Sequence, residues 1–534
     1  MSQFEKLKSF VIPEQKTVSQ KIVRNVLFSG LRAALIWPIP LILIPYILSK
    51  IGVTGYGIWA LFLAMISLSA LSDLGLAGTL TKHVAEHHAR KDNMALNRLV
   101  DTGLMLYILI AVLLAGALCI ASGPLIPVFF RQPLLPRARL QLLWYLSACI
   151  AAINILTIPF YSIVNGLQRM DLSNILSSLS VFCGAALTVV FLSRGWGLEG
   201  LVLANLITPL MVLVCYIWIV HRLLPELKLN PLGCERGEVK QIFSFGLQMY
   251  LTQIAVTVHT QIDKLYLALF TGVAAAGFYN IAGDTAWKLR SVPGMLLNPI
   301  MAAAAELDAQ RAQEKLRELY FRSHKYMALF GLPLVVFVVV FSKPLVDLWL
   351  GPKLAVVAYP LAVLLAIDFF NLTSGPGYLI FIGRGVLRPG VYSAFIGVLV
   401  NLVLSLVLVY FYGLIGAVWG TTIAVFVGTV YFVYLFHDRT GYPLRETVRR
   451  AYLKPFLCSV ASAGVVLALA GHSTRGWPGM LLKAAIFAIL YFTSVALNRF
   501  FDQFDLAKAE SVIPAMRFAR RIIPVAQTSL SVRS

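Results

Sequence analysis

The chain has 534 residues, of which 59% are hydrophobic and only 13% are charged, and its mean hydropathy is +0.80. A soluble domain is usually about one quarter charged, so this composition excludes a soluble protein with a large core. The net charge of +21 is explained by the sidedness of the membrane loops described below, and no nucleic-acid partner is expected.

Apolar runs of 18 or more residues recur along the chain, and each is long enough to cross a bilayer as a helix. They predict an all-α polytopic membrane protein with about fourteen transmembrane helices. The predicted spans are 26–48, 57–80, 101–122, 141–166, 172–193, 198–221, 241–270, 277–304, 325–346, 354–382, 389–411, 414–437, 451–470 and 477–497. The runs are continuous, whereas the strands of a membrane barrel alternate, so helices are predicted rather than a barrel.

The first two spans each carry a charged residue. Arg32 shares the first span with Pro38, Pro40 and Pro45, and these prolines should bend the helix because they remove backbone hydrogen bonds. Arg32 either contacts a ligand or extends its charge to the membrane surface. Asp73, in the second span, either balances charge or caps a helix.

The loop after the second span contains the segment HVAEH, residues 83–87. It matches the H-x-x-E-H pattern of one class of zinc proteases. The loop is basic and offers no strong third ligand, so a solvated helix is expected there. No metal site and no cofactor are predicted.

The chain resembles its own second half. "FSGLRAAL" (28–35) is similar to "FSFGLQMYL" (243–251), and "KIGVTGYGIWAL" (50–61) to "FTGVAAAGFYNIA" (270–282). "YSIVNGLQ" (161–168) and "GLEGLVLANLI" (197–207) likewise resemble "YLIFIGRG" (378–385) and "GLIGAVWGTTI" (413–423). The offsets are 216 or 217 residues, except that aligning Gly55 with Gly277 gives 222. Six spans per repeat give both halves the same orientation, which predicts two lobes with a substrate path between them.

The seventh span carries a polar stripe. Gln253, Thr257, Thr260 and Lys264 recur on one helical face, and Asp263 lies beside it. Such a stripe is costly against lipid, so it should face the other lobe or a watery cavity. Asp263 and Lys264 either serve a substrate or form a structural ion pair, and Lys264 is also within reach of the membrane surface.

The eighth span has a second polar face, formed by Asn280, Asp284, Ser291 and Asn298. Lys288 and Arg290 flank this face, and Asp284 and Lys288 are four residues apart and able to pair. Two basic groups and one acid leave a positive charge near the middle of the membrane, which favours an anionic ligand; the alternative is that the basic groups extend to the surface. Asp368, near the middle of the tenth span, is a further buried carboxylate.

The basic residues predict the orientation. With residues near the end of a span assigned to the adjoining side, 32 of the 45 lysines and arginines lie on the side that holds both termini, 8 lie on the other side and 5 lie deeper within spans. The first side is therefore predicted to be cytoplasmic. The predicted organisation is an N-lobe over 1–221, a cytoplasmic linker over 222–240, a C-lobe over 241–437, two further helices within 451–497 and a basic cytoplasmic tail over 498–534. That tail is expected either on anionic lipid or in solvent.

Two segments resemble the bacterial polysaccharide transporters. "GYGIWALFLAMISLSALSDLGLAGTLTKHVAEHHARKD" (55–92) is similar to that family's second span, in which a Gly-Tyr start leads to D-L-G-L and a basic loop. "QIDKLYLALFTGVAAAGFYNIA" (261–282) is similar to its seventh span, with an Asp beside a basic residue and a later G-F-Y. The family comprises O-antigen and exopolysaccharide flippases, within the superfamily that also contains multidrug exporters and the peptidoglycan-precursor flippase.

The resemblance implies a flippase that moves an undecaprenyl-diphosphate-linked oligosaccharide across the bacterial inner membrane, by alternating access through a cationic cavity between two six-helix lobes. The predicted substrate-binding residues are Arg32, Lys264, Lys288 and Arg290. The predicted coupling or counter-charge residues are Asp73, Asp263, Asp284 and Asp368. Membrane lipids, a polysaccharide polymerase and glycosyltransferases are the other partners that the resemblance suggests.

Other functions remain open at this stage. A cation-coupled multidrug exporter of the same superfamily needs unpaired carboxylates in its cavity, and the basic residues of the seventh and eighth spans argue against it. A membrane scaffold for sugar-polymer assembly would not need polar stripes through the membrane. An enzyme is not expected, because no nucleophile–base set or metal cluster stands out.

Overall fold

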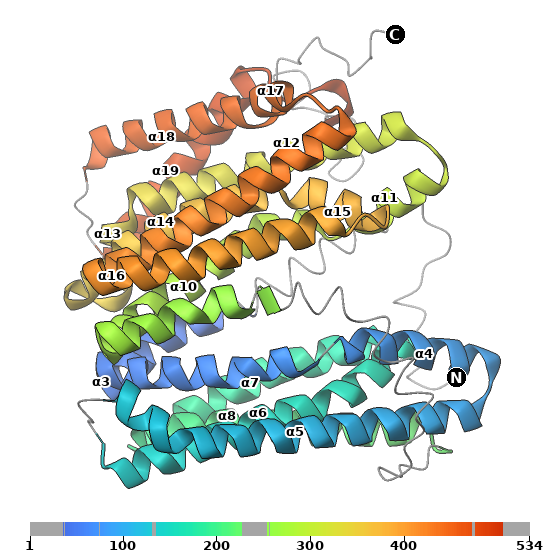
Figure 1. Ribbon diagram of the computed structural model, residues 1–534. Coiled ribbons are helices and arrows are strands. Elements are labelled where there is room, and N and C mark those ends of the chain that lie inside the picture. Colours follow the sequence, from blue (N-terminus) through green and yellow to red (C-terminus); the bar gives the residue numbers. More distant parts are fainter. Residues whose placement is uncertain are drawn as a thin grey trace, which may run out of the picture.

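The computed structural model describes residues 36, 38–73, 75–130, 135–226, 254–255, 257–471 and 476–505. Every regular element within these ranges is a helix. Figure 1 shows the helices in two bundles, which we call the N-lobe (the helices up to Leu223) and the C-lobe (the helices from 257 to Thr440). Most of the predicted linker, from residue 227 on, lies outside the described residues.

The N-lobe consists of α3 (Pro38–Ser67), the 3-10 helix η1 (Leu68–Asp73), α4 (Leu76–Arg90), α5 (Asn93–Phe129), α6 (Arg137–Gly166), α7 (Met170–Ser193) and α8 (Gly197–Leu223). The C-lobe begins with a helix over 257–270, which carries no label in Figure 1. It continues with α10 (Val273–Gly294), η2 (Met295–Leu297), α11 (Ile300–Ala309), α12 (Gln313–Val340), α13 (Ser342–Leu350), η3 (Pro352–Val357), α14 (Ala358–Leu372), α15 (Gly375–Gly383) and α16 (Arg388–Thr440). Beyond it lie α17 (Leu444–Thr447), the π-helical turn η4 (Val448–Leu453), α18 (Lys454–Ala470) and α19 (Gly476–Leu497).

The predicted membrane-spanning fold is confirmed. Ten helical runs in the described residues are long and apolar enough to cross a membrane. Two of them each hold two predicted spans, because Pro38–Asp73 is broken at Gly52 and Arg388–Thr440 is broken at Gly413. Of the predicted seventh span, 241–270, the structure describes a helix over 257–270, and residues 241–253 lie outside the described residues. The predicted eighth span corresponds to α10 through α11, and α10 carries the charged residues Asp284, Lys288 and Arg290.

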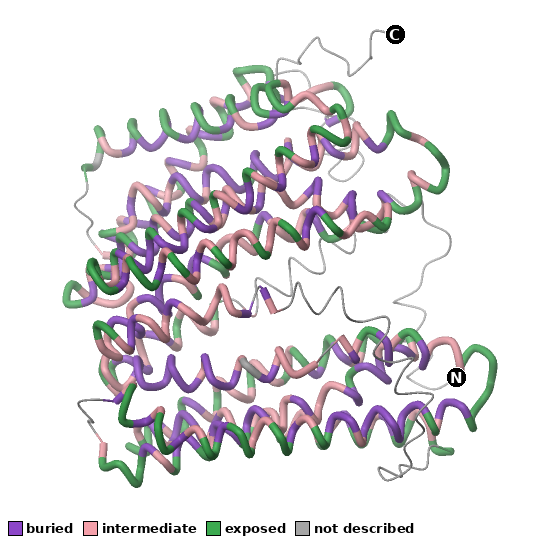
Figure 2. Tube along the Cα trace, viewed as in Figure 1, coloured by how far each residue is buried: buried purple, intermediate pink, exposed green. Residues whose placement is uncertain are grey.

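Apolar side chains cover the outer surfaces of both lobes. Val112 and Ile120 of α5 and Leu399 and Phe411 of α16 are all exposed, on helices that Figure 2 shows along the outside of the bundle. Water would solvate such large apolar surfaces poorly, whereas lipid solvates them well. The chain is therefore a multi-pass membrane protein.

The two lobes repeat the same uncommon backbone conformations. Positive φ angles occur at equivalent points of both lobes, 216 to 220 residues apart. The pairs are Gly52 and Gly272, Lys91 and Arg311, Gln168 and Gly385, and Gly197 and Gly413. Positive φ is uncommon outside glycine, so four such pairs in the same order confirm the predicted parallel repeat.

One alignment within the repeat is corrected. Gly52 and Gly272 each precede the second span of their lobe, and an offset of 220 carried forward from this pair aligns Gly277 with Gly57 rather than with Gly55. The sequence favoured Gly55 because the helix that follows Gly52 offers two glycines, and only the packing distinguishes them.

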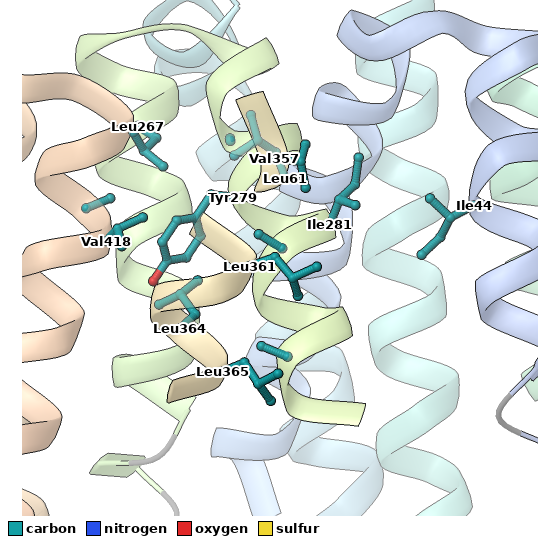
Figure 3. Close-up of a cluster of buried hydrophobic side chains, with 14 of the residues drawn as sticks. Ile44, Leu61, Leu267, Tyr279, Ile281, Val357, Leu361, Leu364, Leu365 and Val418 are labelled. Atoms are coloured by element: carbon teal, nitrogen blue, oxygen red, sulfur yellow. The ribbon is translucent and has the colours of Figure 1, made fainter. Parts of the chain in front are cut away.

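The lobes meet where α3 crosses α10. A Cβ atom added to Gly57 would lie 2.0 Å from the carbonyl oxygen of Val273, and one added to Gly277 would lie 3.0 Å from Cα of Gly57. The two backbones thus touch through a pair of equivalent glycines, as small residues allow in membrane helices. The buried cluster around the crossing takes side chains from both lobes, among them Leu61 and Ile281 (Figure 3).

We call the end of the lobes near this crossing the contact end. Figure 1 shows the described helices of the two lobes close together at the contact end and farther apart at the other end. The described helices of the two lobes are thus joined at the crossing of α3 and α10.

A tryptophan adds a hydrogen bond between the lobes at the contact end. Pro45 lies inside α3 and has no backbone N–H, so the carbonyl of Leu41, four residues earlier, lacks its usual helical donor. The indole Nε1 of Trp349, from α13 of the C-lobe, donates to this carbonyl at 2.6 Å. A proline in the N-lobe thus creates the acceptor that the C-lobe binds.

Helices α18 and α19 pack on the outside of the C-lobe, against α12 and away from the crossing of α3 and α10 (Figure 1). The hydroxyl of Tyr491 donates to the carbonyl oxygen of Leu329 at 2.7 Å. After α19 the chain returns to α12, where Asp505 pairs with Lys325 and accepts a hydrogen bond from Tyr326 at 2.6 Å. The first residues of the predicted tail are thus bound to the C-lobe, and residues 506–534 lie outside the described ranges.

Candidate functional site

One face of α10 is directed at the N-lobe. Gly277 on this face touches α3, and one turn later Nδ2 of Asn280 donates to the hydroxyl of Tyr56 at 3.3 Å. Helical periodicity continues the same face through Asp284 and Ser291 towards the end where the lobes diverge. The polar face predicted from the sequence is therefore directed at the other lobe.

Asp284 and Lys288 of α10 interact with each other and Asp284 with Lys264 of the neighbouring helix, and we call Lys264, Asp284 and Lys288 the inter-lobe charge cluster. Nζ of Lys288 lies 2.6 Å from Oδ2 of Asp284, with side chains 25% and 49% exposed, so the predicted pair forms at an accessible surface. Lys264, from the neighbouring 257–270 helix, donates to Oε1 of Gln261 at 3.0 Å and interacts electrostatically with Asp284 and with Asp263. The three side chains of the cluster carry one net positive charge, and the buried carboxylate of Asp263 lies outside the cluster but also acts on Lys264.

Asp263 is directed into the C-lobe instead. Its carboxylate is 1% exposed and accepts hydrogen bonds from the hydroxyl of Tyr279 at 2.8 Å, from Thr421 Oγ1 and from Nδ2 of Asn401 at 3.5 Å. We call these four residues the Asp263 network. Figure 3 shows Tyr279 near Val418, Leu361 and Leu364, which belong to α16 and α14. Adjacent residues of a helix point in different directions. Asp263 therefore accepts hydrogen bonds from α10 and α16, whereas Lys264 donates to Gln261.

Arg290 is also directed into the C-lobe, towards α14. Its Nη2 donates to Oδ1 of Asn371 at 2.8 Å, and Nδ2 of Asn371 donates to Oγ1 of Thr429 at 3.0 Å. The guanidinium stacks on Trp287, 4.8 Å from the ring centroid, and interacts electrostatically with Asp368. The structure thus brings Arg290 and Asp368 together between α10 and α14.

Asp73 lies apart from the other predicted residues, inside the N-lobe. Its Oδ1 accepts a hydrogen bond from the hydroxyl of Tyr107 at 2.6 Å and one from the backbone N–H of Ala77 at 3.1 Å. The second bond caps the start of α4, so these contacts are those of the helix cap that the sequence left as an alternative. Arg32 lies outside the described residues.

The H-x-x-E-H segment lies on α4. His83 is 3.3 Å from Glu86, and the rings of His83 and His87 are 6.4 Å apart. Within the described ranges no group of three His, Cys, Asp or Glu side chains is placed to hold a metal ion.

Sequence reasoning missed the partners of Asp263. Tyr279 was noted only as part of the G-F-Y segment, and Asn401 and Thr421 were not singled out. Of these residues, Asn401 could have been identified from the sequence, because an amide side chain in the apolar run of the eleventh span is costly unless it has a hydrogen-bond partner. Trp287 gave no signal, since tryptophan is ordinary in a membrane helix.

Comparisons with known proteins fit this geometry. Residues 22–305 match the family described as polysaccharide biosynthesis protein. A putative O-antigen transporter of Shigella flexneri is 21% identical over 397 residues, which cover 72% of this chain and 90% of the transporter.

Two solved structures are similar in fold. The lipid II flippase MurJ, in an inward closed conformation, has a TM-score of 0.71 and 15% identity, covering 89% of this chain and 98% of its own. An inward-facing multidrug resistance transporter of the MATE family, in the MOP superfamily, has a TM-score of 0.53 and 17% identity, covering 73% of this chain and 93% of its own. At these identities the likeness establishes the fold.

Proposed function

The chain belongs to the family of polysaccharide biosynthesis proteins, and from this premise we propose that it is a flippase for a lipid-linked oligosaccharide. The proposed substrate is an oligosaccharide on undecaprenyl diphosphate, moved from the inner to the outer leaflet of the bacterial inner membrane. The proposed product is the lipid-linked precursor of an O-antigen or exopolysaccharide.

The observation that carries the proposal is the inter-lobe charge cluster. A flippase for this substrate must hold a diphosphate inside the membrane, and the diphosphate is a multiply charged anion. Lys288 pairs with Asp284 beside the face of α10 that is directed at the other lobe, and Lys264 interacts electrostatically with Asp284. The two ammonium charges exceed that of Asp284 by one. Ammonium groups in a poorly solvated site attract phosphate more strongly than they do in water. The cluster therefore favours an anionic headgroup over a cationic drug.

The mechanism that we propose is alternating access. With both termini in the cytoplasm, as the basic loops predict, the contact end is the outer end and the lobes diverge towards the cytoplasm. The substrate's headgroup enters from the inner leaflet, contacts the inter-lobe charge cluster, and leaves outward once the crossing at Gly57 and Gly277 separates. The lipid tail stays in the bilayer throughout.

The Asp263 network is the proposed coupling site. It ties the 257–270 helix, α10 and α16 together, and the first two of these also carry the inter-lobe charge cluster. A proton or a monovalent cation that neutralises the buried carboxylate would change the strength of the contacts among these three helices. Binding of the cation would thereby change the position of the inter-lobe charge cluster.

The remaining predicted residues have supporting roles in this proposal. Arg290 and Asp368 balance each other between α10 and α14, Asp73 holds α4 in place, and Arg32 is an additional cationic contact for the headgroup. The proposed partners are membrane lipids, a polysaccharide polymerase and glycosyltransferases that make the substrate.

Neutralising the cluster is expected to weaken headgroup binding at least tenfold. The variant is Lys264→Gln with Lys288→Gln, which removes two charge-assisted contacts worth about 1.5–3 kcal/mol each. The measurement is equilibrium binding of undecaprenyl diphosphate to the purified protein in nanodiscs.

The matched control is Lys343→Gln with Lys353→Gln, which removes the same charge from two exposed lysines near the contact end. The control should bind like the unmodified protein. Equal binding by both double variants would remove the cluster from headgroup recognition. Tighter binding of a cationic dye than of the diphosphate would point to a multidrug exporter instead.

A further inference from the structure

Trp287 is an exposed aromatic side chain on the polar side of α10. It is 52% exposed, whereas the large side chains of Tyr279 and Ile281 on the same helix are buried. Helical periodicity puts it on the same side as Asn280, Ser291 and Asn298, and not on an apolar surface that lipid would cover. An indole in this position needs an explanation other than lipid contact.

Arg290 fixes the orientation of this indole. The guanidinium lies 4.8 Å from the ring centroid and is itself held by Asn371 at 2.8 Å. A cation on one face of an indole is attracted by the electron-rich ring and limits its rotation. The rest of the ring stays open, so Trp287 is a rigid flat surface with one side occupied.

The neighbours of Trp287 suit a sugar. Asp284 precedes it by three residues and presents a half-exposed carboxylate that can accept hydrogen bonds from hydroxyl groups. Ser291 follows it by four residues on the same side of the helix. A pyranose has one apolar C–H face, which packs on an aromatic ring, and a rim of hydroxyls, which need such acceptors and donors.

We infer that Trp287 is the stacking surface for the first sugar of the substrate, next to the diphosphate. This inference rests on the proposed function, because the diphosphate must be held by the inter-lobe charge cluster. Lys288 is the next residue along α10, and the first sugar is covalently attached to the diphosphate, so a headgroup at Lys288 brings that sugar within reach of Trp287. The ligand class is a pyranose in which one face is free of axial hydroxyls.

The inference predicts a preference that depends on Trp287. The two probes are undecaprenyl diphosphate and undecaprenyl diphosphate carrying a single glucose, each bound to the purified protein in nanodiscs. The unmodified protein should bind the glucose-linked lipid more tightly, by on the order of fivefold for one aromatic contact. Trp287→Ala should abolish this preference without changing the affinity for the bare lipid, and Trp287→Phe should keep part of it.

Trp218 provides a matched control on α8. It is 60% exposed and has Arg222 over its ring at 5.5 Å, so it reproduces the pairing of Trp287 with Arg290 at another place in the fold. Trp218→Ala should keep the full preference.

Two results would overturn the inference alone: equal binding of the two lipids by the unmodified protein, or an undiminished preference in Trp287→Ala. Binding of neither lipid by the unmodified protein would overturn the proposed function, and the inference with it.

Discussion

Gly57→Ala is expected to separate the lobes at the contact end and to reduce transport at least tenfold. The new methyl group would lie 2.0 Å from the carbonyl oxygen of Val273, and both partners are backbone, so no side-chain rotation relieves the overlap. Overpacking of this kind costs about 1–3 kcal/mol, which is enough to change the balance between two lobe arrangements. The measurement is labelling of a cysteine placed at Ala276, which is buried beside the crossing, by a water-soluble maleimide.

Two further alanine variants calibrate this result. Gly277→Ala meets its nearest atom at 3.0 Å and should have a smaller effect on labelling, whereas Gly116→Ala has no other atom within 4 Å and should leave labelling unchanged. Alanine is the better helix former by about 1 kcal/mol, so Gly57→Ala would stabilise the protein if α3 and α10 did not touch. Unchanged labelling together with a higher unfolding temperature would therefore contradict the crossing.

Asp263→Asn is expected to abolish the dependence of transport on an ion gradient while leaving the fold intact. Asparagine has the size of aspartate, and the hydroxyls of Tyr279 and Thr421 can reorient to accept as well as donate, so the network survives without its charge. A neutral side chain no longer gains from binding a proton or a cation. The measurement is the initial rate of transport in liposomes with and without imposed proton and sodium gradients.

The interpretation of that variant depends on two controls. Asp263→Ala removes the shared acceptor of Tyr279 and Thr421, and only one of these two hydroxyls can then donate to the other. The remaining buried donor should lower the unfolding temperature, because an unsatisfied group costs about 1–3 kcal/mol. Asp438→Asn removes a carboxylate from an exposed position of α16 and should leave gradient dependence unchanged. Gradient dependence that persists in Asp263→Asn would remove the network from coupling.

The overall architecture was predictable because the signals for it are local. A helix that crosses lipid must be apolar along its whole length, so each span is visible in its own residues. The repeat was visible because glycines at turns and close contacts keep their spacing. The choice between Gly55 and Gly57 was not visible, since it depends on which of them meets Val273 across the crossing.

The candidate site was predictable only in part. The polar face of α10 follows from helical periodicity, and the structure places Asp284 and Lys288 on it as a pair. The separation of Lys264 from Asp263 follows from the angle between adjacent residues, but the partners of Asp263 come from α10 and α16, the latter at Asn401 and Thr421. Asn401 and Thr421 lie 138 and 158 residues from Asp263 along the chain, and no local sequence pattern predicts contacts at such separations.

Arg290 illustrates the same limit. Its charge suggested a place beside Lys288, yet the side chain turns to Asn371 on α14, 81 residues away. A charged residue in a membrane helix needs a partner, and the sequence does not identify which of several polar groups supplies it.

Transport by the purified protein tests the central claim most directly. The protein is reconstituted in liposomes whose inner leaflet carries a fluorescent undecaprenyl-diphosphate oligosaccharide, and the fraction that reaches the outer leaflet is followed with an impermeant quencher. A flippase should move the lipid, and Lys264→Gln with Lys288→Gln should move it at least ten times more slowly at the same protein density. No transfer above protein-free liposomes, together with uptake of a cationic dye, would contradict the account.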